Sequence, residues 1–395
     1  MEFALRLSAL RPPSLRTKET EAAHRSATWL ELFYDLVFVV AVAALGHRLL
    51  LDHDWNGALA FAGLFVPLWW SWAGFTFYAD RYDTDDLGQR LLAVAQMIAI
   101  ALMAGSISGG ESDSAAAFAV AFVLARVVLL TMYTRAYRAV PSTRPLVAGY
   151  LRGFAIGGAF WVVSIWVPDP WRFVLWGVGL AVDFATPYVL RQIQAKVPLS
   201  LSHLPERFGL FTILVLGESI AAVVAGLSEF NWAPASTSGA IIGVLTASGL
   251  WWIYFDNLEG RVVRRREGQR TAWKPTVWIY SHLPLAIGLT ATGIGLEFLV
   301  AQEGESVRWV AVGGVALALF AMGVIHFATE RDDPRRDIRQ AQYRLAAAAL
   351  VLVIGLVSES WEPNILLAAL GLIVGAQVLA DQLILGDSPV AETGL

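Results

Sequence analysis

The chain has 395 residues, of which 56% are hydrophobic and only 16% are charged, and its formal net charge is −4. A soluble protein of this length needs a more polar surface, so the composition excludes an ordinary soluble domain. The chain has no cysteine, which excludes disulfides, thiolate nucleophiles and cysteine metal sites.

Apolar segments long enough to cross about 30 Å of hydrocarbon recur along the chain and predict an all-α integral membrane protein. Residues 1–28 are predicted to form a basic cytoplasmic tail, and not a cleaved signal peptide, because they lack a continuous apolar core. Residues 387–395 are expected to form a C-terminal tail. We predict twelve membrane-spanning helices, at residues 29–50, 56–79, 89–108, 115–134, 147–167, 171–190, 207–228, 237–256, 274–300, 307–328, 341–358 and 364–385.

Lysine and arginine gather in alternate loops, and this asymmetry sets the expected orientation. With the N-terminus cytoplasmic, nearly all basic residues fall on the inside, and an even number of spans returns the C-terminus to the same side. The basic cluster at residues 261–270 is expected to serve this topology and to meet anionic lipid. Membrane lipids are therefore expected partners, and nucleic acid is not.

The chain also contains weak internal similarity. The sequence Glu31-Leu32-Phe33 at the first span is similar to Glu206-Arg207-Phe208 at the seventh, and tryptophan-rich segments follow at residues 69–72 and 251–254. We predict two six-helix repeats, residues 29–195 and 196–386, which are parallel because each holds an even number of spans. The alternative is chance matching among helices rich in tryptophan and phenylalanine.

Two acids, Glu31 and Asp35, stand at the start of the first span. Their i,i+4 spacing places them on one helical face, with Asp35 about 9 Å below Trp29. Close carboxylates at this depth could bind a cation or share a proton. The alternative is that they cap the helix and pair with Arg25 or Arg81.

A third acid, Glu218, lies near the middle of the seventh span. A carboxylate at this depth must be protonated, paired or turned towards water, and Arg126 of the fourth span is the predicted partner. A structural ion pair that fixes helix packing is the alternative. Gly217 and Ser219 would let a neighbouring backbone approach closely.

Two further polar residues lie within predicted spans. His282 precedes Pro284, where we expect the ninth span to be weakened, and a histidine beside a helix break can relay protons. Asp183 lies midway along the sixth span, four residues before Pro187. For both, the alternative is a hydrogen-bonded residue of the protein interior.

Motifs for bound groups are missing from the sequence. The acidic stretch at residues 80–86 could hold a divalent cation, but it lacks the glycine of an EF-hand loop, and a solvated loop with local pairing to Arg81 is favoured. A Walker phosphate loop, a His-Glu-x-x-His metal motif and a Gly-x-Ser-x-Gly elbow are also missing. We therefore expect no metal site and no cofactor.

Two segments carry a family resemblance that covers residues 27–385. The residues Glu31-Leu32-Phe33-Tyr34-Asp35-Leu36-Val37-Phe38-Val39 resemble the opening signature of the bacterial low temperature requirement protein A (LtrA) family, and Leu216-Gly217-Glu218-Ser219-Ile220 resembles its second signature. The resemblance implies a many-spanning protein of the bacterial inner membrane without a settled molecular activity. It also implies that Glu31, Asp35 and Glu218 are family-defining acids.

A fainter likeness extends to the two-repeat potassium channels of endosomes and lysosomes, which also have six spans per repeat. The segment Phe33-Tyr34-Asp35 is similar to their aromatic-Ser-Asp signature, although Tyr34 replaces the serine and Leu210 stands where the second repeat would carry its acid. These channels pair, so this likeness raises a homodimer as one alternative.

The favoured function is transport of an unidentified small solute, coupled to an ion or a proton. Uncoupled cation conduction between the two repeats is the first alternative, and a membrane-embedded enzyme acting on a lipid or isoprenoid is the second. The residues predicted to form the ion or proton pathway are Glu31, Asp35, Glu218, His282, Asp183 and Arg126.

Overall fold

The computed structural model describes residues 12–16, 28–83, 86–107, 112–197, 203–229, 232–258, 273–302, 307–329 and 334–386. Within these residues, twelve long α-helices correspond one to one to the twelve predicted spans, so the all-α fold is confirmed. Their bounds are α2 Trp29–Leu51, α3 Trp55–Arg81, α4 Leu87–Ile107, α5 Ser112–Ala139, α6 Arg144–Ser164, α7 Trp171–Val189, α9 His203–Glu229, α10 Pro234–Leu258, α11 Lys274–Val300, α12 Arg308–Ala328, α13 Pro334–Val357 and α14 Pro363–Gly386.

Eleven of these helices in the described part of the chain are long and apolar enough to cross a membrane. The remaining long helix, α7, has 19 residues and carries Arg172 and Asp183, which lower its mean hydropathy. Whether the chain has the twelve spans predicted from sequence therefore depends on whether α7 crosses the membrane. The cytoplasmic position of both termini stays a prediction.

The chain divides into two compact units. Unit 1 consists of residues 1–48 and 63–207, and unit 2 consists of residues 49–62 and 208–395. The tip of the α2–α3 hairpin therefore belongs to unit 2, and the first turn of α9 belongs to unit 1. The predicted repeats, 29–195 and 196–386, divide the chain at a nearby place, but their relationship as parallel repeats stays a prediction.

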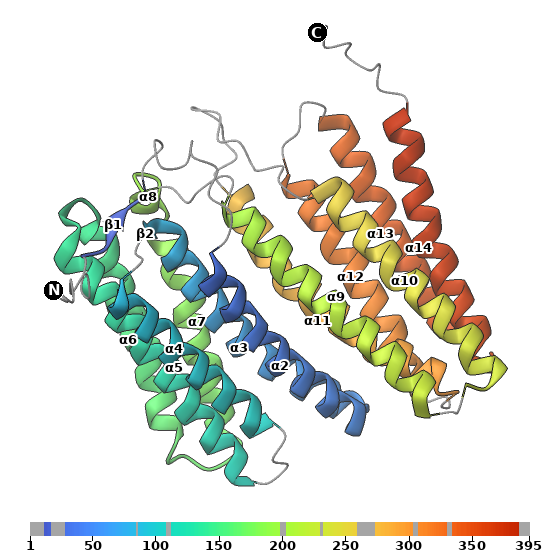
Figure 1. Cartoon of the computed structure of the whole chain (residues 1–395), viewed down its shortest axis with the longest axis horizontal. Coiled ribbons are helices and arrows are strands. Elements are labelled where there is room, and N and C mark those ends of the chain that lie inside the picture. Colours follow the sequence, from blue (N-terminus) through green and yellow to red (C-terminus); the bar gives the residue numbers. More distant parts are fainter. Residues whose placement is uncertain are drawn as a thin grey trace, which may run out of the picture. The chain divides into compact units, whose positions relative to one another are not determined.

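In unit 1, α4, α5, α6 and α7 pack in chain order, each against the next (Figure 1). Glycines at positions 149, 153 and 157 form a small-residue face on α6 that lets α7 approach closely. A Cβ atom added to Gly153 would lie 2.1 Å from Thr186 Oγ1 of α7. Four residues after Gly157, Trp161 stacks on Phe122 of α5 and Trp176 of α7, with ring centroids 4.0 and 4.6 Å apart.

In unit 2, α11 packs against α12, α12 against α13, and α10 against α14 (Figure 1). Close backbone contact requires glycine here too, since a Cβ atom on Gly295 of α11 would lie 2.3 Å from the Ala311 Cα of α12. The ninth span is not broken at Pro284, because α11 runs continuously from Lys274 to Val300 with this proline inside it. Dense packing on neighbouring helices accommodates a proline that would destabilise an isolated helix.

A short β-ribbon lies at the C-terminal end of α3 in unit 1. Strand β1, Ser14–Leu15, pairs antiparallel with β2, Tyr82–Asp83, directly after α3. The Arg16 amide also donates a 2.9 Å hydrogen bond to the Arg81 carbonyl. This ribbon fixes an N-terminal segment to the end of α3. The 3₁₀-helix Pro141–Thr143 and the short helix α8, Arg191–Gln194, connect longer helices of the same unit.

Candidate functional site

The first turn of α2 is capped by its own side chains. Glu31 Oε2 accepts hydrogen bonds from the Thr28 amide at 2.8 Å and the Thr28 hydroxyl at 3.0 Å, and the Glu31 amide donates back to Thr28 Oγ1 at 3.3 Å. This reciprocal pattern is a capping box, which satisfies amides that lack helical partners. Helix capping by Glu31, one of the two sequence-based interpretations, is therefore observed.

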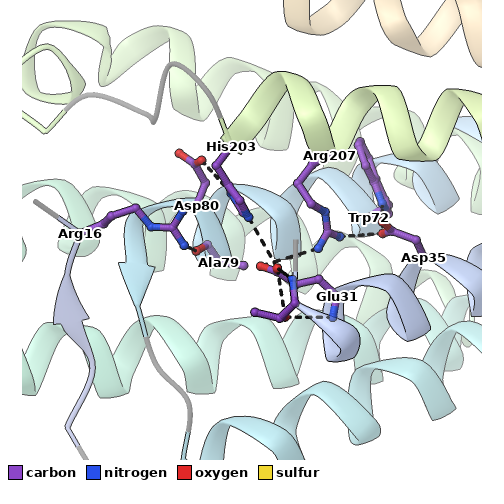
Figure 2. A network of polar contacts seen from close by, with 9 residues as sticks. Arg16, Glu31, Asp35, Trp72, Ala79, Asp80, His203 and Arg207 are labelled. Carbon is purple, nitrogen blue, oxygen red and sulfur yellow. Dashed lines mark hydrogen bonds and ion pairs between the residues drawn. The ribbon is translucent and has the colours of Figure 1, made fainter. Parts of the chain in front are cut away.

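One turn further along α2, Asp35 is completely buried and forms the shortest ion pair of this region. Its Oδ1 atom accepts a 2.6 Å hydrogen bond from Arg207 Nη2 and a 2.8 Å hydrogen bond from the Trp72 indole (Figure 2). Arg207, on the first turns of α9, is fully buried as well. An isolated charge would be very costly in this interior, so removal of either partner should strongly destabilise the other.

His203 contacts two further acids of the region, Glu31 and Asp80. Its Nε2 atom lies 3.5 Å from Glu31 Oε2, and its Nδ1 atom lies 3.3 Å from Asp80 Oδ1 (Figure 2). Arg207 Nη1 also approaches Glu31 Oε1 at 3.7 Å. Helices α2, α3 and α9 thus contribute the side chains of one network, which we call the charge cluster: Glu31, Asp35, Trp72, Asp80, His203 and Arg207.

Further positive charges border the charge cluster. Arg16 of the N-terminal segment donates a 3.4 Å hydrogen bond to the Ala79 carbonyl, next to Asp80 (Figure 2). Arg81 is buried on α3 with its guanidinium 5.6 Å from the centre of the Tyr150 ring. Three carboxylates therefore face three arginines and one histidine, so the total charge of this region depends on the proton held by His203.

The sequence predicted the Glu31–Asp35 pair but not its partners, for which Arg25 and Arg81 were proposed. Arg25 lies outside the described residues, and the partners in the structure are Arg207 and His203. A signal for them exists, because His203 and Arg207 are four residues apart and so share one helical face. Long-range pairing, over 172 residues for Asp35 and Arg207, cannot be read from such a pattern alone.

In the acidic stretch at residues 80–86, the sequence favoured a solvated loop, but Asp80 in the last turn of α3 and Asp86 just before α4 are buried, while residues 84 and 85 lie outside the described residues. Asp80 and Asp86 are 1% and 3% exposed. Asp80 contacts His203, whereas Asp86 accepts a 2.8 Å hydrogen bond from Arg135 and a 2.9 Å bond from the Gln89 amide at the start of α4. Among the described residues there is no group of three or more histidines and acids that could hold a metal ion.

A second buried ion pair in unit 1 joins Arg126 of α5 to Asp183 of α7. The sequence had proposed Glu218 as the partner of Arg126. Gly157 makes room for the acid, because a Cβ atom at this position would lie 2.4 Å from Asp183 Oδ1. The guanidinium also lies 5.1 Å from the centre of the Phe122 ring, which adds a cation–π contact.

His282 of unit 2 lies in an aromatic cage. Its Nδ1 atom is 2.7 Å from the Trp278 carbonyl, which can only accept, so Nδ1 carries the proton. In the neutral ring, Nε2 then accepts from the Tyr254 hydroxyl at 3.0 Å. The Phe208 ring closes the cage at 4.7 Å between ring centres. Both ring nitrogens are therefore used within unit 2, as in a hydrogen-bonded interior histidine.

Glu218 of α9 differs from every other predicted acid. Its side chain is half-buried, and within the described residues it makes no hydrogen bond or ion pair. The neighbouring Gly217 is exposed, and a Cβ atom there would meet nothing within 4 Å. By contrast, Ser219 turns inwards and donates a 3.1 Å hydrogen bond to the Leu289 carbonyl of α11. Glu218 thus lies at the edge of an open face of α9.

The sequence profile of the bacterial low temperature requirement A protein (LtrA) family matches residues 26–380, most of the chain. This chain belongs to the LtrA family. An uncharacterized protein of Rhizobium meliloti (strain 1021) is 29% identical to this LtrA protein over 305 residues, which cover 73% of this chain and 72% of the relative. The family match and the apolar helices together establish a multi-pass membrane protein. The charge cluster is built from α2, α3 and α9, three of the helices that are long and apolar enough to cross a membrane.

Proposed function

We propose that this LtrA protein transports a small solute or ion across the bacterial inner membrane, and that the charge cluster couples this movement to an ion or a proton. One observation carries the proposal: Asp35 is completely buried in a membrane-spanning helix, yet its Oδ2 atom has no hydrogen-bond partner among the described residues. A buried carboxylate oxygen without a partner is costly. A binding site that is filled and emptied during a transport cycle provides a reason to keep it.

The surroundings of Asp35 support this role. Arg207 Nη1 and Nε are likewise buried without hydrogen bonds among the described residues. Both side chains of the ion pair can therefore form further hydrogen bonds. An entering proton, water or cation can therefore interact with Asp35 without first breaking its bonds to Trp72 and Arg207. A purely structural ion pair would gain stability by using these atoms.

Glu218 supplies the second element of the proposal. A half-buried carboxylate in a membrane-spanning helix must be protonated, paired or turned towards water. Because it makes no bond within the described residues, it is free to exchange a proton or contact a solute. Arg126 neutralises Asp183 and His282 completes its cage, so in our proposal these three residues support the helices that carry the pathway.

Flux measurements on purified protein in liposomes test the proposal. We expect wild type to move ions or protons down an imposed gradient, and Asp35→Asn or Glu218→Gln to reduce this flux at least tenfold while insertion is unchanged. Glu359→Gln, an exposed acid in the turn before α14, is the matched control and should retain flux. Normal flux in both site variants would overturn the proposed role of these acids.

The same liposomes separate transport from channel conduction. A transporter shows saturable flux that depends on a second gradient, whereas a channel conducts in response to voltage alone. Currents in planar bilayers without any coupled gradient would replace the transporter proposal by the cation channel. Reporter fusions at the two termini would test their proposed cytoplasmic location.

A further inference from the structure

The charge cluster contains a histidine whose two nitrogens both face acids, from two different helices. Glu31 belongs to α2 and Asp80 to α3, while His203 begins α9. An ionised carboxylate can only accept hydrogen bonds, and a neutral imidazole can donate from one nitrogen only. Both contacts are therefore satisfied only when the cluster holds one extra proton, and the imidazolium form of His203 is the arrangement that satisfies them together.

We propose that a proton is the coupling ion of this protein and that His203 carries it between Glu31 and Asp80. This inference rests on the transport function proposed above and names the ion that uses the site. When His203 is an imidazolium, it ties the start of α9 to both α2 and α3. When it loses the proton from one nitrogen, the lone pair of that nitrogen faces a carboxylate, and one of the two ties is lost.

The charges around His203 favour a proton over a metal cation as the exchanged ion. Glu31 faces Arg207 as well as His203, and Asp35 is held by Arg207. Arg16 and Arg81 lie on the Asp80 side of the cluster. A metal cation would have to displace these positive groups or approach them closely, which is electrostatically unfavourable. A proton adds to a nitrogen that is already in place and needs no new ligands.

The change of state has a consequence for the helices. In the charge cluster, His203 and Arg207 both join the first turns of α9 to α2, and His203 also contacts Asp80 of α3 (Figure 2). The hydrogen bond from Arg207 to Asp35 does not involve His203. Loss of the His203 proton therefore weakens one side of the junction and leaves the Arg207–Asp35 pair intact.

Histidine NMR on isotope-labelled protein in detergent tests the protonation state directly. The chain has six histidines, and the His203 signal is assigned as the one missing from His203→Gln. We expect the signal of a doubly protonated ring at neutral pH, and its loss in the variant that combines Glu31→Gln with Asp80→Asn. A singly protonated His203 in wild type at the pH of transport would overturn the inference.

Flux assays supply the second readout. His203→Gln should lower proton flux at least tenfold, and His203→Arg, which keeps a permanent charge between the acids, should fold and insert yet fail to couple. His47→Gln, the same change at an exposed histidine, should transport normally. Flux that follows sodium or potassium and persists in His203→Gln would overturn the inference alone. A wild type without any flux would overturn the proposed transport function and this inference with it.

Discussion

Arg207 donates a 2.6 Å hydrogen bond to Asp35, with both side chains fully buried and 172 positions apart in the chain. This pair ties the first turns of α9 to α2 within unit 1. Since buried charges are stable only when paired, the contact links the helices energetically as well as geometrically.

Removal of one partner from this pair should be much more damaging than removal of both. We expect Arg207→Gln to lower the free energy of unfolding by about 3–5 kcal/mol, because Asp35 is left buried with an uncompensated charge. Combining Arg207→Leu with Asp35→Leu should recover most of this loss. Reversible unfolding in detergent measures both variants, and equal destabilisation by the two would show that the charges are not coupled.

The Trp72 indole makes a separable contribution to the same acid. Trp72→Phe keeps the ring in place but removes the 2.8 Å hydrogen bond to Asp35, so we expect a loss of about 1.5–3 kcal/mol. Trp161→Phe is the matched control, because Trp161 is also fully buried but its indole N–H makes no hydrogen bond among the described residues. A similar loss in both variants would assign the effect to packing alone.

The small-residue face of α6 should tolerate no added methyl group beside Asp183. Gly157→Ala places a Cβ atom 2.4 Å from Asp183 Oδ1 and 3.0 Å from the Gly179 carbonyl. We expect about 1–3 kcal/mol of destabilisation from the forced displacement of α7 and its ion pair with Arg126. Gly177→Ala on the exposed side of α7 is the control, and should be neutral or stabilising because its Cβ meets nothing within 4 Å. Unchanged thermal stability of Gly157→Ala would contradict this close contact.

The aromatic cage of His282 should matter for stability and not for flux. Tyr254→Phe removes one hydrogen bond to His282 Nε2, for which we expect a loss of about 0.5–1.5 kcal/mol. Transport in liposomes should remain within twofold of wild type. Loss of flux without loss of stability would instead place His282 in the pathway, as one reading of the sequence suggested.

The sequence predicted the helices well because a membrane imposes a simple rule. A segment must be apolar over roughly 20 residues and must satisfy its own backbone, and both requirements are local. All twelve predicted segments correspond to helices in the structure. Pro284 shows the limit of such local rules, because α11 is continuous through it and neighbouring helices decide whether a proline interrupts a membrane helix.

The sequence identified the polar residues within the membrane spans but not their partners. Sequence identified Glu31, Asp35, Asp183, Arg126, His282 and Glu218 as unusual, because charged or titratable groups are costly in a membrane wherever they stand. It could not identify their partners, because the pairing depends on which helices lie side by side. Arg207, the first residue of the predicted seventh span, is buried against Asp35, and Arg126 pairs with Asp183.

The sequence by itself determined that this is a membrane protein, where its helices lie and to which family it belongs, since each of these depends on local composition or on short sequence motifs. Only the tertiary structure decided that Asp80, His203 and Arg207 join Glu31 and Asp35 in one buried cluster. Electrostatic pairing acts between atoms a few ångströms apart, and residues far apart in sequence reach such distances only when their helices pack together.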